Sequence, residues 1–269
     1  AWLRALLLER ERIANHLGDL GYLGNDAGFA FGLAQFSRLR EDVLRTNLAA
    51  FGHRLLMDVV VPGGVARDLD AAHVEKIRDE CAMLDREVQV IRDIYNDHAG
   101  VQDRFRNCGR VPPALARKLG LTGLAGRASG QAHDLRCDFP VAPYDALDVR
   151  PVVLADGDVA ARVAVRFGEI AESLRLVRAL LDSLPAGDLV AALPALPEHR
   201  LGLGTVESWR GPVLVALTTG ENGGIRRCHP QDPSWANWPV LEHAIIGNIV
   251  PDFPLINKSF NLSYSGHDL

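Results

Sequence analysis

The chain has 269 residues, of which 48% are hydrophobic and 23% are charged. This balance is typical of a soluble globular protein of one large or two small domains, and it excludes a disordered chain, a collagen and a coiled-coil fibre. The 29 basic and 34 acidic residues leave a net charge of -5. Because no overall basic field exists to hold a phosphate backbone, nucleic acid is not an expected partner.

The sequence also argues against a membrane span. The best candidate, residues 55–61, is short and contains Asp58, whereas a bilayer requires ~20 apolar residues. The first residues lack a secretory signal, since residues 1–4 run directly into the charged segment 9–12. Because the sequence starts without Met and within a helical pattern, we expect residues 1–269 to be a single domain of an N-terminally truncated fragment.

Four long segments carry apolar residues at the spacing of an amphipathic helix. Asp70 is expected to cap the third segment and the turn Asp156-Gly157-Asp158 to cap the fourth. Pro62 and Pro185 follow the second and fourth segments, where proline cannot continue a helix. The predicted helices cover residues 3 to between 21 and 28, about 31–57, about 70–97, and from 158 to just before 185. Four apolar stripes satisfy one another by packing together, so the sequence predicts a mainly α fold built on a helical bundle.

Shorter elements fill the rest of the chain. Pro112 and Pro113 start a short predicted helix that ends at Gly120. The segment 122–144 is rich in Gly, Pro and polar residues and is predicted to be a long loop. Residues 204–207 and 213–217 are predicted to form a hairpin, followed by a helix near 237–248. The fold therefore gains a small β region in its C-terminal third.

The polar residues of the first helix leave two interpretations open. Arg12 and His16 lie one helical turn apart, as do Glu11 and Asn15. From spacing alone, this patch is either a solvated face or a satisfied structural network. The remaining polar positions between the apolar residues of this helix include Glu9 and Asp19.

The four cysteines show neither a disulfide framework nor a CxxC pair. Cys81 lies on the apolar stripe of the third helix, so we expect a small buried core residue rather than a reactive thiol. A zinc site formed by Cys108, Cys137, Cys228 and His229 is the alternative to ordinary thiols, but it would need four single ligands to converge. The cysteine pattern favours a reducing cytoplasm.

Common nucleotide and hydrolase motifs are missing. The glycine-rich segments 202–204 and 220–224 form neither GxGxxG nor a phosphate loop. Segment 126–130 differs from a nucleophile elbow because Ser129 stands one position too late for GxSxG.

Five groups of motifs nevertheless occur in a recognisable order. They are Glu11-Arg12-Ile13-Ala14-Asn15-His16-Leu17, Asn25-Asp26-Ala27-Gly28-Phe29, Gly52-His53-Arg54 with Pro62-Gly63-Gly64-Val65, Gly126-Arg127-Ala128-Ser129-Gly130 with Asp134-Leu135-Arg136, and Val206-Glu207-Ser208-Trp209-Arg210-Gly211. This order resembles the large subunits of membrane-bound nickel-iron hydrogenases of the formate hydrogenlyase type. It resembles more distantly the quinone-site large subunit of respiratory complex I. The resemblance runs from the first predicted helix to the last residue.

The resemblance implies a helical protein that docks against a small subunit with an iron-sulfur cluster, together with antiporter-like membrane subunits. In the hydrogenases of this family, four cysteine thiolates hold a nickel-iron centre, two from an N-terminal CxxC and two from a C-terminal Asp-Pro-Cys-x-x-Cys segment. In complex I the same space accepts quinone. The family also implies a cytoplasmic location, peripheral to the inner face of the cell membrane.

The C-terminal segment departs from the hydrogenase pattern. Ser263 and Gly266 stand at the positions of the two cysteines, and neither a serine hydroxyl nor a glycine hydrogen replaces a thiolate as a ligand of a soft metal. His53 is retained as in the hydrogenases, whereas Leu56 stands where complex I has a histidine. We therefore expect a hydrogenase-related protein that binds neither nickel nor any other metal or cofactor of its own, and that has no hydrogenase activity.

The resemblance also nominates site residues. Asp26 matches the acidic residue beside the complex I quinone site and is a candidate proton relay, with a turn or cap role as the alternative. Glu207 and His53 complete the predicted catalytic residues. The predicted cofactor-side residues are Arg127, Arg136, Arg210, Ser263 and His267. For the arginines and Glu207, structural ion pairing is an equally good interpretation.

Two functions follow from these expectations. The first is a subunit that couples electron transfer from the iron-sulfur partner to proton chemistry or to a quinone-like acceptor. The second is a non-catalytic scaffold that links the iron-sulfur subunit to the membrane subunits. An open cavity lined by Asp26, His53 and the segment 263–267 would favour the first, and a filled space would favour the second.

Overall fold

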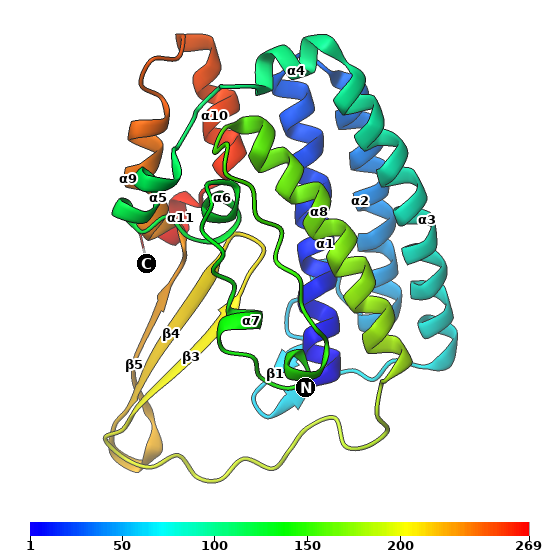
Figure 1. The fold of residues 1–269 in the computed structure, drawn as a ribbon. Coiled ribbons are helices and arrows are strands. Elements are labelled where there is room, and N and C mark those ends of the chain that lie inside the picture. The colour runs from blue at the N-terminus through cyan, green and yellow to red at the C-terminus, as the bar shows by residue number, and fades with distance from the viewer. Residues whose placement is uncertain (269) are drawn as a thin grey trace.

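Four long helices form the body of the protein, whose computed structural model describes residues 1–268 (Figure 1). They are α1 (Trp2–Asp26), α2 (Ala30–Phe51), α3 (Ala71–Asp97) and α8 (Val159–Asp182). Helix α1 packs against α2 and α8, and α3 packs against the same two helices. The predicted helical bundle is therefore confirmed.

The helix boundaries follow local chemistry. The Asp70 carboxylate accepts the backbone N–H of His73 at 2.8 Å, and the Asp158 carboxylate accepts that of Ala161 at 2.8 Å, so both predicted caps are present. Helix α2 ends at Phe51, earlier than predicted, because Gly52 takes a left-handed conformation with φ of 79°.

The bundle core is apolar and closely packed around Tyr95. The Tyr95 ring meets Phe36 and Phe167 edge to face, with centroid distances of 5.7 and 5.8 Å. Its hydroxyl donates to the carbonyl oxygen of Leu20 at 2.8 Å. Cys81 lies in the same core, where burial raises its pKa to about 11, which confirms its predicted place in the core.

The segment between α3 and α8 contains more helix than predicted. Helices α4 (Ala99–Phe105) and α5 (Pro113–Leu119) come first, and α5 begins at proline and ends at glycine as expected. The predicted loop 122–144 instead contains α6 (Gly123–Ala128) and α7 (Leu135–Asp138), and a 3-10 turn covers Tyr144–Ala146. The loop prediction was wrong because these helices are too short to show a periodic apolar stripe.

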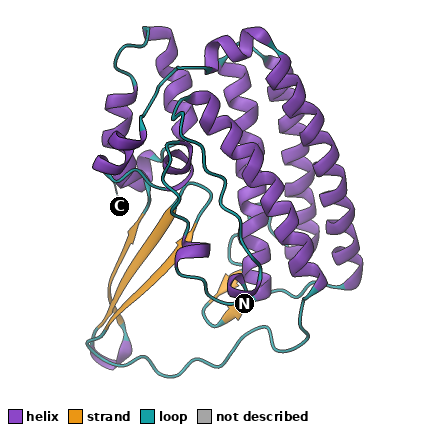
Figure 2. Ribbon diagram, in the orientation of Figure 1, coloured by secondary structure: helices purple, strands orange, loops and turns teal. Residues whose placement is uncertain are grey.

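A three-stranded antiparallel sheet projects from the bundle, as Figure 2 shows at lower left. Its strands are β3 (Leu201–Glu207), β4 (Pro212–Thr219) and β5 (Ile225–Gln231), in that order. The predicted hairpin corresponds to β3 and β4, and the third strand was missed. A second, small hairpin joins β1 (Val60–Val61) to β2 (Gly64–Val65).

Three helices end the described chain. They are α9 (Ser234–Ala244), α10 (Phe253–Phe260) and α11 (Tyr264–His267), with 3-10 turns at Glu221–Gly223 and Val250–Asp252. Helix α10 packs against α1 and α8, which brings the C-terminal segment to the bundle. Within residues 1–268, no helix is both long and apolar enough to span a membrane.

Candidate functional site

Helices α1 and α8 face each other through polar side chains along one line. The two helices run antiparallel, so that the contacts pair Glu9 with Ser173, His16 with Glu169, and Asp19 with Arg166. All of these side chains are buried. On each helix these polar residues recur every three or four positions, or at a multiple of that spacing, so they lie on one face. Here that face is buried and carries charged side chains.

The Glu9 carboxylate forms the first junction of this polar line. It accepts hydrogen bonds from the Arg136 guanidinium at 3.0 Å, from the Tyr144 hydroxyl at 2.7 Å and from the Ser173 hydroxyl at 2.6 Å. Burial by itself would raise the pKa of Glu9, but the positive charges of Arg136 and Arg12 outweigh it and lower the pKa. Glu9 is therefore a buried carboxylate.

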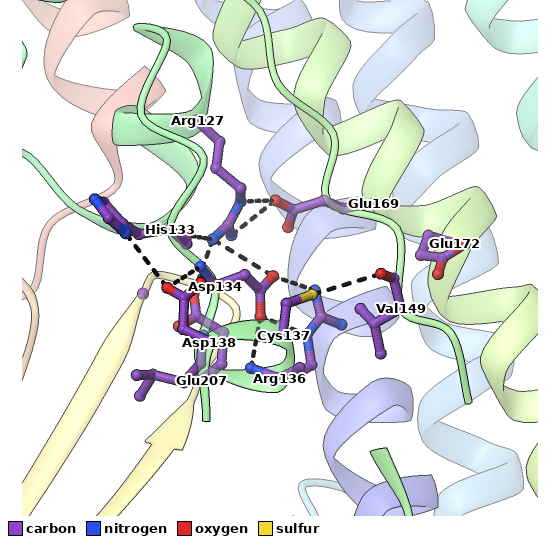
Figure 3. Close-up of polar contacts among 12 residues, drawn as sticks. Arg127, His133, Asp134, Arg136, Cys137, Asp138, Val149, Glu169, Glu172 and Glu207 are labelled. Carbon is purple, nitrogen blue, oxygen red and sulfur yellow. Dashed lines mark hydrogen bonds and ion pairs between the residues drawn. The ribbon is translucent and has the colours of Figure 1, made fainter. Parts of the chain in front are cut away.

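Arg127 joins two more carboxylates from different elements (Figure 3). Its Nε donates to Glu169 at 2.8 Å and its Nη1 donates to Glu207 at 2.9 Å. Burial opposes ionisation of Glu169, yet Arg127 and His16 hold its pKa well below the ordinary value. Helix α6, helix α8 and strand β3 thus meet at one guanidinium.

Asp134 and Arg136 form a third junction within α7 and its cap. The Arg136 guanidinium binds both Asp134 oxygens, at 3.0 and 2.7 Å. Although burial would raise the pKa of Asp134, the hydrogen bonds and charge of Arg136 lower it to about 2. We call the connected set the buried ion network; it comprises Glu9, Arg12, His16, Arg127, Asp134, Arg136, Glu169 and Glu207.

Burial shifts the pKa values of two members of the buried ion network toward the neutral form. Burial raises the pKa of Glu207, and its attraction to Arg127 only partly offsets this. Burial also lowers the pKa of His16, despite its 2.7 Å contact with Glu169. Within residues 1–268, the Nδ1 atom of His16 has no hydrogen-bond partner. A charged imidazole would leave an N–H donor unsatisfied there, so the neutral form fits the site.

A second polar cluster joins α1 and α8 to the C-terminal segment. The Asp19 carboxylate accepts hydrogen bonds from Arg166 Nε at 3.1 Å, from Asn261 Nδ2 at 2.7 Å and from Lys258 Nζ at 3.3 Å. Arg210 reaches the same place and donates to the Asn261 carbonyl oxygen at 2.7 Å. These contacts fill the space between α1 and the end of α10.

The segment 263–267, here called the tail, has its own structural roles. The Ser263 hydroxyl caps α11 by accepting the Gly266 N–H at 2.9 Å. A Cβ atom at Gly266 would lie 2.8 Å from Asp232 Cβ, which is too close for an ordinary contact. The His267 ring lies 5.8 Å from the Trp235 ring. The tail is therefore packed around a capping serine and a glycine.

This donor set does not fit a nickel-iron centre. Such a centre takes soft thiolate ligands, whereas Ser263 presents a hydroxyl that is used as a cap and Gly266 presents no side chain. Within residues 1–268, no three His, Cys, Asp or Glu side chains gather as a metal site. The alternative zinc set is dispersed, because Cys108 is buried near the end of α4 whereas Cys228 is exposed on β5.

Asp26 and His53 lie far from each other. Asp26 ends α1, in the turn where Gly28 has φ of 81°, whereas His53 follows the opposite end of α2. At 1.5 Å per residue, the 22 residues of α2 separate them by roughly 33 Å. The single cavity lined by Asp26, His53 and the tail, which would have favoured the electron-coupling function, is therefore not formed. His53 Nδ1 instead accepts the N–H groups of Leu55 and Met57, at 3.1 and 3.3 Å.

A different cavity touches the buried ion network. It has a volume of about 410 Å³ and lies beside the start of α1, with Leu7, Leu8, Leu56 and Val206 in its largely apolar lining. Tyr144 also lines this cavity, and its hydroxyl donates to Glu9. We call it the α1 cavity. Tyr144 therefore lies between the largely apolar α1 cavity and the buried Glu9 carboxylate.

The predicted site residues thus divide into groups. Arg127, Arg136 and Glu207 come together in the buried ion network, whereas Arg210 joins the Asp19 cluster and Ser263 and His267 lie in the tail. Their roles as catalytic or cofactor-side residues stay predictions. Sequence reasoning missed the partners Glu9, Tyr144, Asp134, Glu169 and Ser173. The signal was available on α8, where Arg162, Arg166, Glu169 and Ser173 repeat every three or four residues.

The fold and its charged interior define a subunit of the kind found in respiratory membrane complexes. The solved structure of the membrane-bound sulfane sulfur reductase, an archaeal respiratory membrane complex, contains a chain that matches all of this one with a TM-score of 0.93 and 26% sequence identity. The match covers 74% of that chain. Similarity at this level extends over the bundle, the sheet and the tail.

Sequence comparison names the family. The family described as the 49 kDa subunit of the respiratory-chain NADH dehydrogenase matches residues 26–201. Formate hydrogenlyase subunit 5 of Escherichia coli is 34% identical over 99% of this chain, and the carbon monoxide-induced hydrogenase of Rhodospirillum rubrum is 30% identical over 97% of it. The chain therefore belongs to the family of the 49 kDa subunit, as the motifs predicted. It spans 47% of the formate hydrogenlyase protein and 72% of the Rhodospirillum protein.

Proposed function

We propose that this chain is the large-subunit-like component of a membrane-associated oxidoreductase complex related to hydrogenases and complex I. In that complex it couples electron transfer from an iron-sulfur partner subunit to proton chemistry and to a quinone-like acceptor. Family membership supports the general role. The observation that carries the chemistry is the Tyr144 hydroxyl, which lines the α1 cavity and donates to Glu9 of the buried ion network.

The α1 cavity suits an apolar, planar acceptor. Its volume of about 410 Å³ falls in the range of small-molecule sites, which are mostly apolar with a few fixed polar groups. Leucine and valine side chains would contact the ring, and Tyr144 would orient a polar oxygen. A quinone bound there would supply the chemistry of accepting two electrons and two protons.

The buried ion network provides groups that hold and release protons. Tyr144 contacts Glu9, and Arg12 lies 3.4 Å from Glu9 and 3.8 Å from Glu169. Glu169 contacts His16, whose lowered pKa keeps the imidazole neutral. Because carboxylates with lowered and raised pKa values adjoin in this network, a proton has defined places to reside, with Glu207 the most basic carboxylate.

The acceptor proposal is tested by filling the α1 cavity. Val206→Trp places a large ring in the cavity, and we expect at least a tenfold loss of quinone reduction by the assembled complex. Tyr144→Phe keeps the cavity apolar but removes the hydroxyl, so it should lower turnover and change its pH profile. Val90→Trp, on an exposed position of α3, is the matched control. Unchanged turnover in Val206→Trp would exclude the cavity as the acceptor site.

The chain is proposed not to hold nickel and not to turn over hydrogen. The capping role of Ser263 and the closed space at Gly266 support this. Nickel content of the purified, assembled complex, measured by mass spectrometry, is expected to be substoichiometric. One nickel per complex would refute the proposal.

The proposed partners are an iron-sulfur small subunit and antiporter-like membrane subunits, with the chain peripheral to the inner face of the cell membrane. An uncovered apolar loop between α9 and α10 supports assembly with other subunits, because Ile246, Ile249 and Val250 are 73%, 66% and 87% exposed. Replacing Ile249 and Val250 by serine should reduce recovery of the chain with washed membranes. Unchanged recovery would argue against this surface.

A scaffold role is the second candidate, and a specific observation favours it. The Asp19 cluster fills the space between α1 and the end of α10, just before the tail, and a filled space was the feature expected of a scaffold. A scaffold predicts that Val206→Trp and Tyr144→Phe leave electron transfer unchanged. It also predicts that removing the chain separates the iron-sulfur subunit from the membrane.

A further inference from the structure

The tip of the three-stranded sheet carries a concentration of positive charge. His199, Arg200, Arg226 and Arg227 line one open cavity of about 390 Å³, in a chain whose net charge is -5. Figure 1 places this tip at the lower left, away from the helical bundle. The cavity is therefore separate from the α1 cavity and from the buried ion network.

An irregularity in the sheet aims two neighbouring arginines at the same cavity. In a regular strand, successive side chains point to opposite faces. Here Thr218 pairs with Arg227 and Thr219 pairs with Ile225, so Arg226 is an extra residue in a β-bulge. A bulge redirects side chains, and Arg226 and Arg227 both line the cavity. The bulge thus doubles the charge that β5 presents.

The three arginines of this tip lack acidic partners. In the described part of the chain, none of them lies within 4.0 Å of a carboxylate oxygen, the distance that defines an ion pair. The neighbouring carboxylate of Glu198 accepts the Asn222 N–H at 2.8 Å and so serves the adjoining turn. Many arginines elsewhere are paired, as Arg178 is with Asp85 at 2.8 Å, whereas here three arginines without an ion pair in the described part of the chain line one cavity. The positive charge at the tip is left available to a ligand.

We propose that this tip binds a phosphate group, carried by a soluble phosphorylated compound or by a lipid headgroup. Guanidinium groups match phosphate oxygens with paired hydrogen bonds. A phosphate with nearly two negative charges uses several arginines at once, whereas a single carboxylate uses fewer. Thr218 supplies a hydroxyl to the lining, and Leu201 is the apolar residue of the lining. The proposal does not depend on the function of the α1 cavity.

The first experiment measures binding to the unmodified chain. Inorganic pyrophosphate is titrated by calorimetry at low ionic strength, and vesicles of phosphatidylcholine and phosphatidylglycerol in a 3:1 ratio are tested by co-sedimentation. We expect saturable pyrophosphate binding that weakens as salt is raised. Vesicle binding that pyrophosphate displaces would assign a lipid headgroup, and pyrophosphate binding without vesicle binding would assign a soluble ligand.

The variants locate the site. Arg226→Gln combined with Arg227→Gln should weaken pyrophosphate binding at least tenfold. The double variant Arg86→Gln and Arg117→Gln removes the same charge from exposed positions on α3 and α5, and we expect it to bind as the unmodified chain does. Thermal unfolding of both variants verifies that the fold is kept.

Three results would overturn the proposal. They are no saturable binding of pyrophosphate or vesicles by the unmodified chain, equal weakening in both double variants, and binding to polyglutamate without binding to phosphate. The last result would assign the tip to an acidic protein segment.

Discussion

Tyr144 donates its hydroxyl to Glu9 across 2.7 Å, and this contact joins the α1 cavity to the buried ion network. The two residues come from a 3-10 turn and from α1, and lie 135 positions apart in the sequence. Burial and the adjacent Glu9 charge raise the pKa of Tyr144, so the tyrosine remains a donor. The orientation of the hydrogen bond is thereby fixed.

Glu9→Gln should strongly destabilise the chain. The substitution removes the charge that Arg136 contacts at 3.0 Å, and it leaves a buried guanidinium with a weaker partner. Breaking a buried pair on one side costs about 3 kcal/mol, which urea unfolding would measure. Glu75→Gln is the control, because Glu75 is 73% exposed and such a substitution costs under about 0.5 kcal/mol. Equal effects of the two substitutions would contradict a structural role for Glu9.

Gly24→Ala is expected to destabilise the bundle by about 1–3 kcal/mol through overpacking. The new Cβ atom would overlap the Tyr95 hydroxyl oxygen. In a Tyr95→Phe background this oxygen is gone, so the cost of Gly24→Ala should fall by more than half. A double-mutant cycle of unfolding free energies checks the coupling. If Gly24→Ala costs the same in both backgrounds, the close approach is not the cause.

The four long helices and their caps could be predicted because periodicity and capping are local properties. The buried ion network could not, since Arg12 and His16 interrupt an apolar stripe in the same way whether they face water or another helix. Their burial depends on Glu169, 153 positions away from His16. For Arg12 and His16 the network interpretation proved correct, because both side chains are buried, whereas Glu11 of the same patch is exposed.

The cavity that would have joined Asp26, His53 and the tail is absent for a geometric reason. Asp26 and His53 were assigned to one site because both belong to family motifs. In the structure they lie at opposite ends of α2. Glu207, Arg127 and Arg136 did converge, because β3 and α7 approach α1 while α6 approaches β3 and α8. Family motifs therefore identified important positions without specifying which of them share a site.

Gly266→Ala should destabilise the tail by about 1–3 kcal/mol, because the added Cβ atom would lie 2.8 Å from Asp232 Cβ. In an Asp232→Gly background the two closest atoms are absent and Ser263 Cβ, at 3.0 Å, remains, so the cost should fall by more than half. Unfolding free energies of the four chains in this cycle test the prediction. An undiminished cost in the Asp232→Gly background would show that Gly266 is required for another reason.

His16 should make the stability of the chain depend on pH near neutrality. Burial lowers its pKa below the ordinary value of 6.5 in the folded state. The unfolded chain therefore takes up a proton first as the pH falls, so the stabilising contribution is complete above about pH 6.5 and is lost below it. Between its two pKa values, the loss is about 1.4 kcal/mol per pH unit.

The His16 effect is isolated by comparison with His16→Gln, whose amide retains a donor for Glu169. Urea unfolding from pH 7.5 to 5.5 should show a shallower pH slope in this variant than in the unmodified chain. Glu207 acts in the opposite sense, since its raised pKa stabilises the fold at low pH and this contribution is lost as the pH rises through the folded-state pKa. Both the unmodified chain and His16→Gln contain Glu207, so the difference between their unfolding free energies at each pH removes the Glu207 contribution. His243→Gln, on an exposed position of α9, is the control and should leave the pH slope unchanged. If His16→Gln has the same pH slope as the unmodified chain, the pKa of His16 does not differ between the folded and unfolded states.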